Sequence, residues 1–144
     1  MGKRRKAREL ALKILFHLEY NHGNPEDALS LIYKNFKSPE SERAFSKKLV
    51  LGVYERLESI DKLITQSSKN WRMERMSHVD RSILRLGTFE MLYLDDVPPK
   101  VTIDEAVELG KKFGTEDSGA FINGILDNIF NRLKQEDPLL KNKI

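Results

Sequence analysis

The sequence has 144 residues, no cysteine and a formal net charge of +3. This length suits one domain that folds without disulfides, so we expect a single domain over residues 1–144 with a frayed tail from about residue 136. The absence of cysteine excludes disulfide bonds and cysteine-ligated zinc, and no apolar run approaches the ~20 residues needed to cross a membrane. We therefore expect a cytoplasmic protein without a membrane partner.

The first predicted helix carries the main charge asymmetry of the chain. Its apolar residues recur at helical spacing until about Asn21-His22-Gly23. Residues 1–8 hold five cations before the first acid, so the other 136 residues sum to −2. The cations are Lys3, Arg4, Arg5, Lys6 and Arg8. They are suited to neutralising phosphates at one end of the molecule, and the alternative is a solvated N-terminal tail.

The next stretch predicts two helices and a short connection. Asn24-Pro25-Glu26-Asp27 has the cap, the proline and the acids of a helix start, and this helix should end by Phe36. Ser38-Pro39-Glu40 starts another helix, which stays apolar on one face for about 20 residues and should break near Ser59-Ile60-Asp61. Lys69 to Met76 predicts a short basic connection or an irregular helix.

The second half of the chain predicts three further helices. Ser77 caps a helix whose residues from Val79 to Leu94 are apolar on almost every side, which indicates the most buried helix. Thr102 and Glu105 have the spacing of a capping box, and Gly114 is placed to close that helix in the left-handed conformation. A polar turn, Glu116-Asp117-Ser118, then leads to a last apolar stripe from Phe121 to Leu133. The predicted class is all-α, a compact bundle of about six or seven helices.

The sequence offers no pattern typical of an enzyme. Its three histidines lack the spacing that places two metal ligands on one helix face, and no glycine-rich phosphate loop occurs. The carboxylates of Asp104, Glu105 and Glu108 are explained equally well by the capping box and a solvated helix face. We therefore expect no catalytic residue, no metal site and no cofactor.

Three stretches carry a more specific signal than helical periodicity. They are Arg4–Ala11, then Asp80–Leu86 with Glu90-Met91 after it, and the discontinuous block from Ile103 to Asp127. Together they resemble, in order and position, the NusB family of bacterial transcription antitermination factors. The resemblance covers nearly the whole chain.

The resemblance implies a non-enzymatic factor that binds boxA-type single-stranded RNA of ribosomal RNA leader transcripts. It implies two partners besides RNA: the small-subunit ribosomal protein NusE and the RNA polymerase elongation complex. The factor is expected to help this elongation complex resist termination. The resemblance also admits a homodimer that hides the RNA surface.

The implied RNA surface joins the cations of the first helix to Asp117, Ser118 and Phe121. Asp117 either accepts hydrogen bonds from a base or a 2′-hydroxyl or caps the last helix, and Phe121 either stacks on a base or packs in the core. The implied NusE contacts are Phe16 and Asp80, where a known member has Tyr and Glu. Phe16 lies away from the main apolar face, so it either meets a partner protein or a base, or packs against a second helix.

Two other functions remain as alternatives. One is a protein-binding helical scaffold with only non-specific affinity for RNA. The other is a domain related to the RNA-binding part of RNA cytosine methyltransferases, although this chain lacks a Rossmann-like glycine-rich turn.

Overall fold

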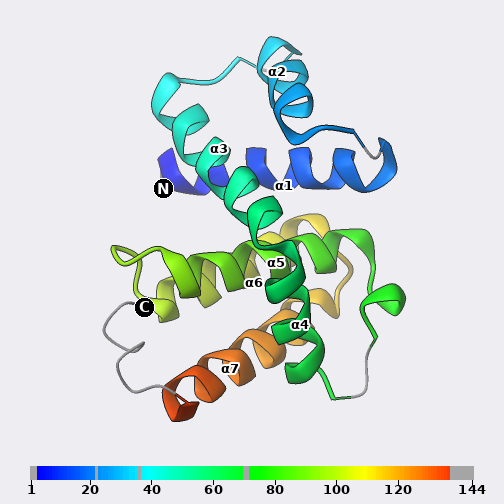
Figure 1. The fold of residues 1–144 in the computed structure, drawn as a ribbon, viewed down its shortest axis with the longest axis vertical. Helices are drawn as coiled ribbons and strands as arrows, with labels where there is room; N and C mark the ends of the chain where they lie inside the picture. Colours follow the sequence, from blue (N-terminus) through cyan, green and yellow to red (C-terminus); the bar gives the residue numbers. More distant parts are fainter. Residues whose placement is uncertain (1–2, 22, 36, 70–71, 137–144) are drawn as a thin grey trace. The chain divides into compact units, whose positions relative to one another are not determined.

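The computed structural model describes residues 3–21, 23–35, 37–69 and 72–136. Over these residues it contains only helices and no strand, which confirms the all-α prediction (Figure 1). The elements are α1 (Lys3–Asn21), α2 (Pro25–Asn35), α3 (Glu40–Glu55), α4 (Leu57–Ser67), the 3₁₀ helix η1 (Met73–Arg75), α5 (His78–Tyr93), α6 (Pro99–Phe113) and α7 (Ser118–Glu136).

The helices form two compact units, residues 1–55 and 56–144, which we call the N-terminal and C-terminal units. The expected organisation as one domain stays a prediction. Of the tail expected from about residue 136, residues 137–144 lie outside the described residues, as does Trp71 in the predicted basic connection.

The N-terminal unit is built on α1, which packs against both α2 and α3 (Figure 1). Ile14 of α1 and Leu49 and Val53 of α3 are fully buried. The predicted start of α2 is confirmed, because the Glu26 N–H donates a hydrogen bond to Asn24 Oδ1 at 2.7 Å. Buried apolar residues thus hold α1 against α3, and a local cap marks the start of α2.

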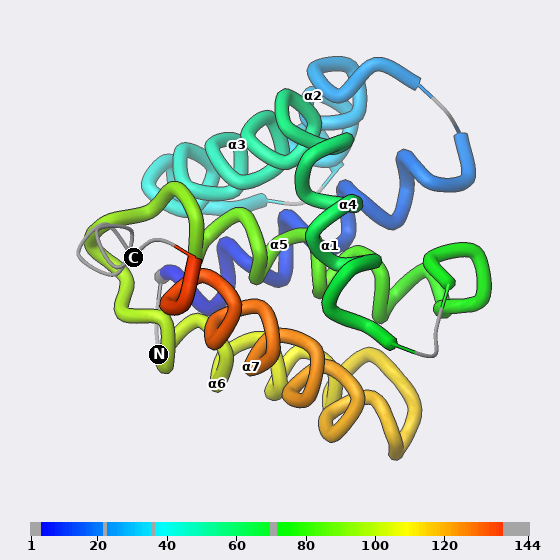
Figure 2. Tube along the Cα trace, turned by 60° about the horizontal axis from the view of Figure 1, so that its bottom comes forward, coloured from blue at the N-terminus to red at the C-terminus, as the bar shows by residue number. Residues whose placement is uncertain are grey.

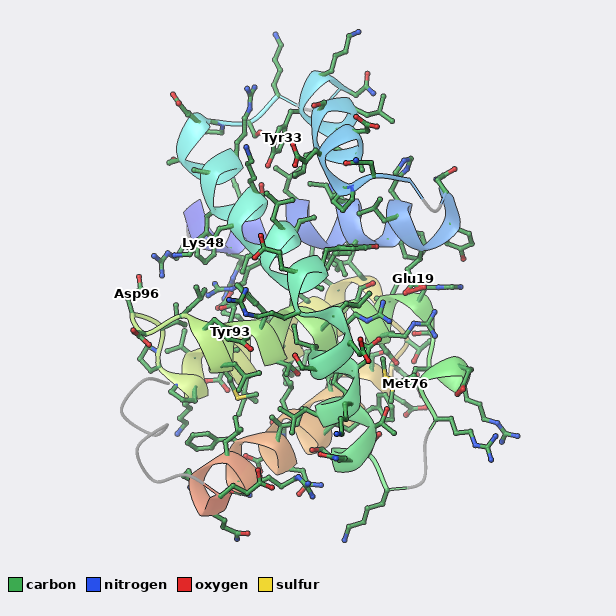
Figure 3. All side chains as sticks on the ribbon, in the orientation of Figure 1. Glu19, Tyr33, Lys48, Met76, Tyr93 and Asp96 are labelled. Atoms are coloured by element: carbon green, nitrogen blue, oxygen red, sulfur yellow. The ribbon has the colours of Figure 1, made fainter. Side chains whose placement is uncertain are left out.

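Tyr33 joins α2 to α3 (Figure 3). Its hydroxyl donates to the Arg43 carbonyl oxygen at 2.8 Å and lies 2.7 Å from Ser46 Oγ. Burial raises the pKa of the Tyr33 hydroxyl above its usual value. Tyr33 thus combines apolar packing with a satisfied polar end.

In the C-terminal unit α5 packs against α4, α6 and α7, and α6 and α7 run side by side (Figure 2). The predicted burial of α5 is confirmed, since Ile83, Leu84 and Met91 are fully buried. Arg85 of α5 donates from Nε and from one terminal nitrogen to the two carboxylate oxygens of Asp61 on α4, each at 2.8 Å. This bidentate pair fixes the register of the two helices.

Two predicted boundaries are wrong. The break expected near residues 59–61 occurs at Arg56, whose guanidinium carbon lies 4.2 Å from the centre of the Tyr93 ring. α6 begins at Pro99 rather than at a capping box, because proline is pre-organised for the first helical position. Thr102 is therefore inside the helix, where its buried hydroxyl donates to Glu90 Oε1 at 3.4 Å.

Candidate nucleic-acid interface

Positive charge is concentrated in the N-terminal unit. Residues 1–55 contain eleven Lys and Arg against seven Asp and Glu, a net charge of +4, whereas residues 56–144 carry −1. A polyanion is therefore attracted mainly to the N-terminal unit. The expected binding cations occupy the first two turns of α1, where no acidic residue precedes Glu9.

The predicted cations of α1 differ in accessibility. Arg4 and Lys6 are exposed and Arg5 is half-buried, so these three can reach a ligand in solution. Arg8 is only 5% exposed. Lys3 is the first residue of α1, and its side chain lies outside the described part of the structure.

Phe45 of α3 is a neighbour of these cations that the sequence did not reveal. The guanidinium carbon of Arg4 lies 4.5 Å from the centre of the Phe45 ring, and that of Arg8 lies 5.7 Å from it. Both distances are typical of cation–π contacts. The pairing depends on the packing of α1 on α3, so no local sequence pattern predicts it.

The turn between α6 and α7 is built on Gly114 and Ser118. The Thr115 N–H donates to Ser118 Oγ at 2.9 Å, and the Ser118 N–H donates to the Thr115 carbonyl oxygen at 3.1 Å. Gly114 has a φ of −97°, so the predicted left-handed closure is wrong. Glycine is needed for space instead, because a Cβ there would overlap Ser118 Oγ and lie 2.8 Å from the Gly110 carbonyl oxygen.

The three residues predicted for RNA in this turn have different environments. Asp117 is exposed and its carbonyl oxygen accepts the Phe121 N–H at 3.1 Å, while no side-chain hydrogen bond links its carboxylate to another described residue. Phe121 is half-buried, which leaves part of its ring accessible. Ser118 is 1% exposed and holds the turn from within.

The two residues predicted to contact NusE belong to different units. Phe16 of α1 is half-buried, and its ring meets that of Tyr20 edge to face at 5.0 Å between centroids. Asp80 lies in the first turn of α5, where its N–H donates to Ser77 Oγ at 3.0 Å and confirms the predicted cap. Its Oδ1 is buried and has no hydrogen-bond partner among the residues described.

The described residues also bear on metal binding and on membrane insertion. No group of three or more His, Cys, Asp or Glu side chains among them is arranged to hold a metal ion. None of the described helices is long and apolar enough to span a membrane.

A helical fold with its positive charge gathered in one unit is typical of a helical nucleic-acid-binding protein. Residues 5–131 match the model of the NusB family, and the chain belongs to this family. A transcription antitermination protein NusB from Desulfatibacillum aliphaticivorans is 46% identical over 143 residues, 99% of this chain and 100% of that relative. Another from Desulforapulum autotrophicum is 50% identical over 131 residues, 90% of this chain and 92% of that relative.

Solved structures agree with this assignment. T. maritima NusB is 38% identical, with a TM-score of 0.83, and the match covers 93% of this chain and 97% of that one. A chain from a structure of the antitermination factors NusB and NusE in complex with double-stranded RNA is 30% identical, with a TM-score of 0.81. That match covers 92% of this chain and 98% of the other.

Proposed function

We propose that this chain is a transcription antitermination factor that binds RNA together with NusE and acts as a scaffold, without enzymatic activity. The observation that carries the proposal is the full-length similarity to transcription antitermination proteins NusB, at 46% identity over 99% of the chain. The solved complex of a 30% identical chain with NusE and RNA supports both partners.

We further propose which RNA is bound and where in the cell the complex acts. The RNA is boxA-type single-stranded RNA of ribosomal RNA leader transcripts, and the complex loads onto RNA polymerase in the cytoplasm. A homodimer of this chain would store the factor with its RNA surface hidden. Since the related solved complex holds double-stranded RNA, a duplex of the same sequence is the informative competitor.

The environments of the α1 cations suggest their roles. The exposed Arg4 and Lys6, with Lys3 and the half-buried Arg5, neutralise phosphates and release counterions. Arg8 is buried against Phe45, so its role is to position neighbouring groups and to raise the local potential.

The turn before α7 supplies the contacts that read bases. The exposed Asp117 carboxylate accepts from a base amino group or a 2′-hydroxyl, and the accessible part of the Phe121 ring stacks on a base. Ser118 contributes by holding the turn that presents both side chains.

NusE recognition uses Phe16 and Asp80. Phe16 offers apolar ring surface beside Tyr20, which is 58% exposed. Asp80 is half-buried, so the accessible part of its carboxylate can accept a hydrogen bond from a NusE donor, whereas its Oδ1 is buried.

Charge reversal of the α1 cations tests the assignment. Arg4→Glu with Lys6→Glu should weaken boxA binding at least tenfold at low salt and flatten its salt dependence, because each lost phosphate contact lowers the slope of log affinity against log salt by about 0.7. Lys34→Glu with Lys37→Glu, which reverses two other exposed charges in the same unit, is the matched control. Circular dichroism should show unchanged helicity, and unchanged RNA affinity of the double variant would overturn the assignment.

A protein-binding scaffold with only general RNA affinity is the competing function. It predicts equal affinity for boxA and for scrambled RNA, with or without NusE. A boxA preference that depends on the residues of the turn before α7 would exclude it.

A further inference from the structure

The basic end of α1 contacts a side chain of α3, Phe45, to which the proposed function assigns no role of its own. Phe45 lies 4.5 Å from the Arg4 guanidinium carbon and 5.7 Å from that of Arg8. A ring beneath a guanidinium stabilises one arrangement of an otherwise flexible side chain, which reduces the entropy lost when that side chain binds a phosphate. Phe45 is thus placed to pre-organise the exposed Arg4 for a phosphate and to hold the buried Arg8 in position beside it.

Lys48 extends the same side of α3. It follows Phe45 by three residues, which places it only about 60° around the helix from the ring. Lys48 is exposed on α3, the helix that packs against α1, and it is labelled in Figure 3. Lys48 is therefore on the side of α3 next to Phe45, whose ring contacts Arg4 and Arg8 of α1.

Lys47 provides an internal comparison. It is equally a lysine and equally exposed, but it lies about 160° around α3 from Phe45. If RNA is attracted only by the charge of the N-terminal unit, Lys47 and Lys48 should contribute equally to RNA affinity. If RNA contacts this side of α3, only Lys48 should contribute.

We propose that α3 forms part of the RNA-binding surface of the N-terminal unit, with Phe45 as a positioning residue for Arg4 and Arg8 and Lys48 as an additional phosphate ligand. This inference rests on the proposed function, because it assumes that the α1 cations bind RNA. A protein ligand of mixed charge fits less well, because α1 opens with a run of cations that no acid interrupts before Glu9, and such a run suits the repeated phosphates of a nucleic acid. The proposed ligand of this surface is therefore the phosphate backbone of RNA.

The lysine pair gives the first test. Lys48→Ala and Lys47→Ala are each titrated with labelled boxA RNA in the presence of NusE at two salt concentrations. Lys48→Ala should bind at least threefold more weakly and lower the salt slope by about 0.7, whereas Lys47→Ala should stay within twofold of wild type with an unchanged slope. Equal effects of the two substitutions, whether large or absent, would overturn the role of Lys48.

The ring gives the second test. Phe45→Leu keeps an apolar side chain but removes the π face, so boxA affinity should fall about two- to fivefold, while Phe45→Tyr should bind like wild type. Thermal unfolding of both variants separates this effect from a loss of folding. Equal binding by Phe45→Leu and Phe45→Tyr would overturn the positioning role.

Different results would contradict the proposed function and the role of Lys48. If wild-type protein does not prefer boxA, the proposed function itself is wrong. If wild type prefers boxA but Lys48→Ala matches Lys47→Ala, only the contribution of Lys48 from α3 is wrong.

Discussion

Gly114→Ala should be the most damaging small substitution in the turn that presents Asp117 and Phe121. The added Cβ would overlap Ser118 Oγ and lie 2.7 Å from Ser118 Cβ and 2.8 Å from the Gly110 carbonyl oxygen. That carbonyl accepts the Gly114 N–H at 2.9 Å, so it can move away only by opening the last turn of α6. Ser118 can move only by weakening the Thr115 N–H bond at 2.9 Å.

The expected cost combines an overpacking term of about 1–3 kcal/mol with a weakened hydrogen bond worth about 1 kcal/mol. We expect a total of about 2–4 kcal/mol, measured as a shift of the urea midpoint at constant m-value. BoxA affinity should fall as well, because the turn that carries Asp117 is distorted.

Gly124→Ala is the matched control in the next helix. A Cβ at Gly124 meets no atom within 4 Å, and this glycine is exposed inside α7. Replacement by alanine should stabilise the protein by about 0.5–1 kcal/mol through helix propensity. Equal stability of the two variants would refute the argument that Gly114 is required for space.

Three further predictions concern stability. Asp61→Ala should lower the free energy of unfolding by about 1–3 kcal/mol, because it leaves Arg85 without its bidentate bond. A double-mutant cycle with Arg85→Ala should show coupling between the two residues. Additive effects of the two substitutions would contradict the pairing. Ser77→Ala should cost about 1 kcal/mol in denaturant unfolding by removing the acceptor of the Asp80 N–H, and Ser77→Asp should restore most of it; a neutral alanine variant would argue against the cap. Above about pH 10 an unfolded tyrosine loses its proton, whereas native Tyr33 keeps it because its pKa is raised. The free energy of unfolding should therefore fall with rising pH above about pH 10, and more steeply in wild type than in Tyr33→Phe. Parallel pH profiles of the two proteins would contradict the raised pKa.

Local chemistry made part of the fold predictable. Asn24 and Ser77 mark helix starts because their side chains bind backbone N–H groups two and three residues ahead, so the signal is complete within a few residues. Thr102 and Glu105 have the same kind of spacing, yet that prediction failed. Pro99 begins α6 earlier, and the Thr102 hydroxyl is bound to Glu90 of a different helix.

The candidate site was predictable to a similar extent. The cations of α1 form a continuous run, so their position on one helix followed from sequence alone. Phe45 did not, because its contact with Arg4 joins residues on two helices through tertiary packing. The burial of Ser118 and the spatial need for Gly114 also depend on how α6 meets α7 rather than on residue type.

The most direct test of the central claim is a titration of fluorescent boxA RNA against scrambled RNA of equal composition. It should be run with and without purified NusE and at two salt concentrations. We predict tighter binding to boxA, a preference that strengthens when NusE is present, and a fall in affinity as salt rises. Equal, weak and salt-sensitive binding to both RNAs in the presence of NusE would contradict a sequence-specific antitermination factor.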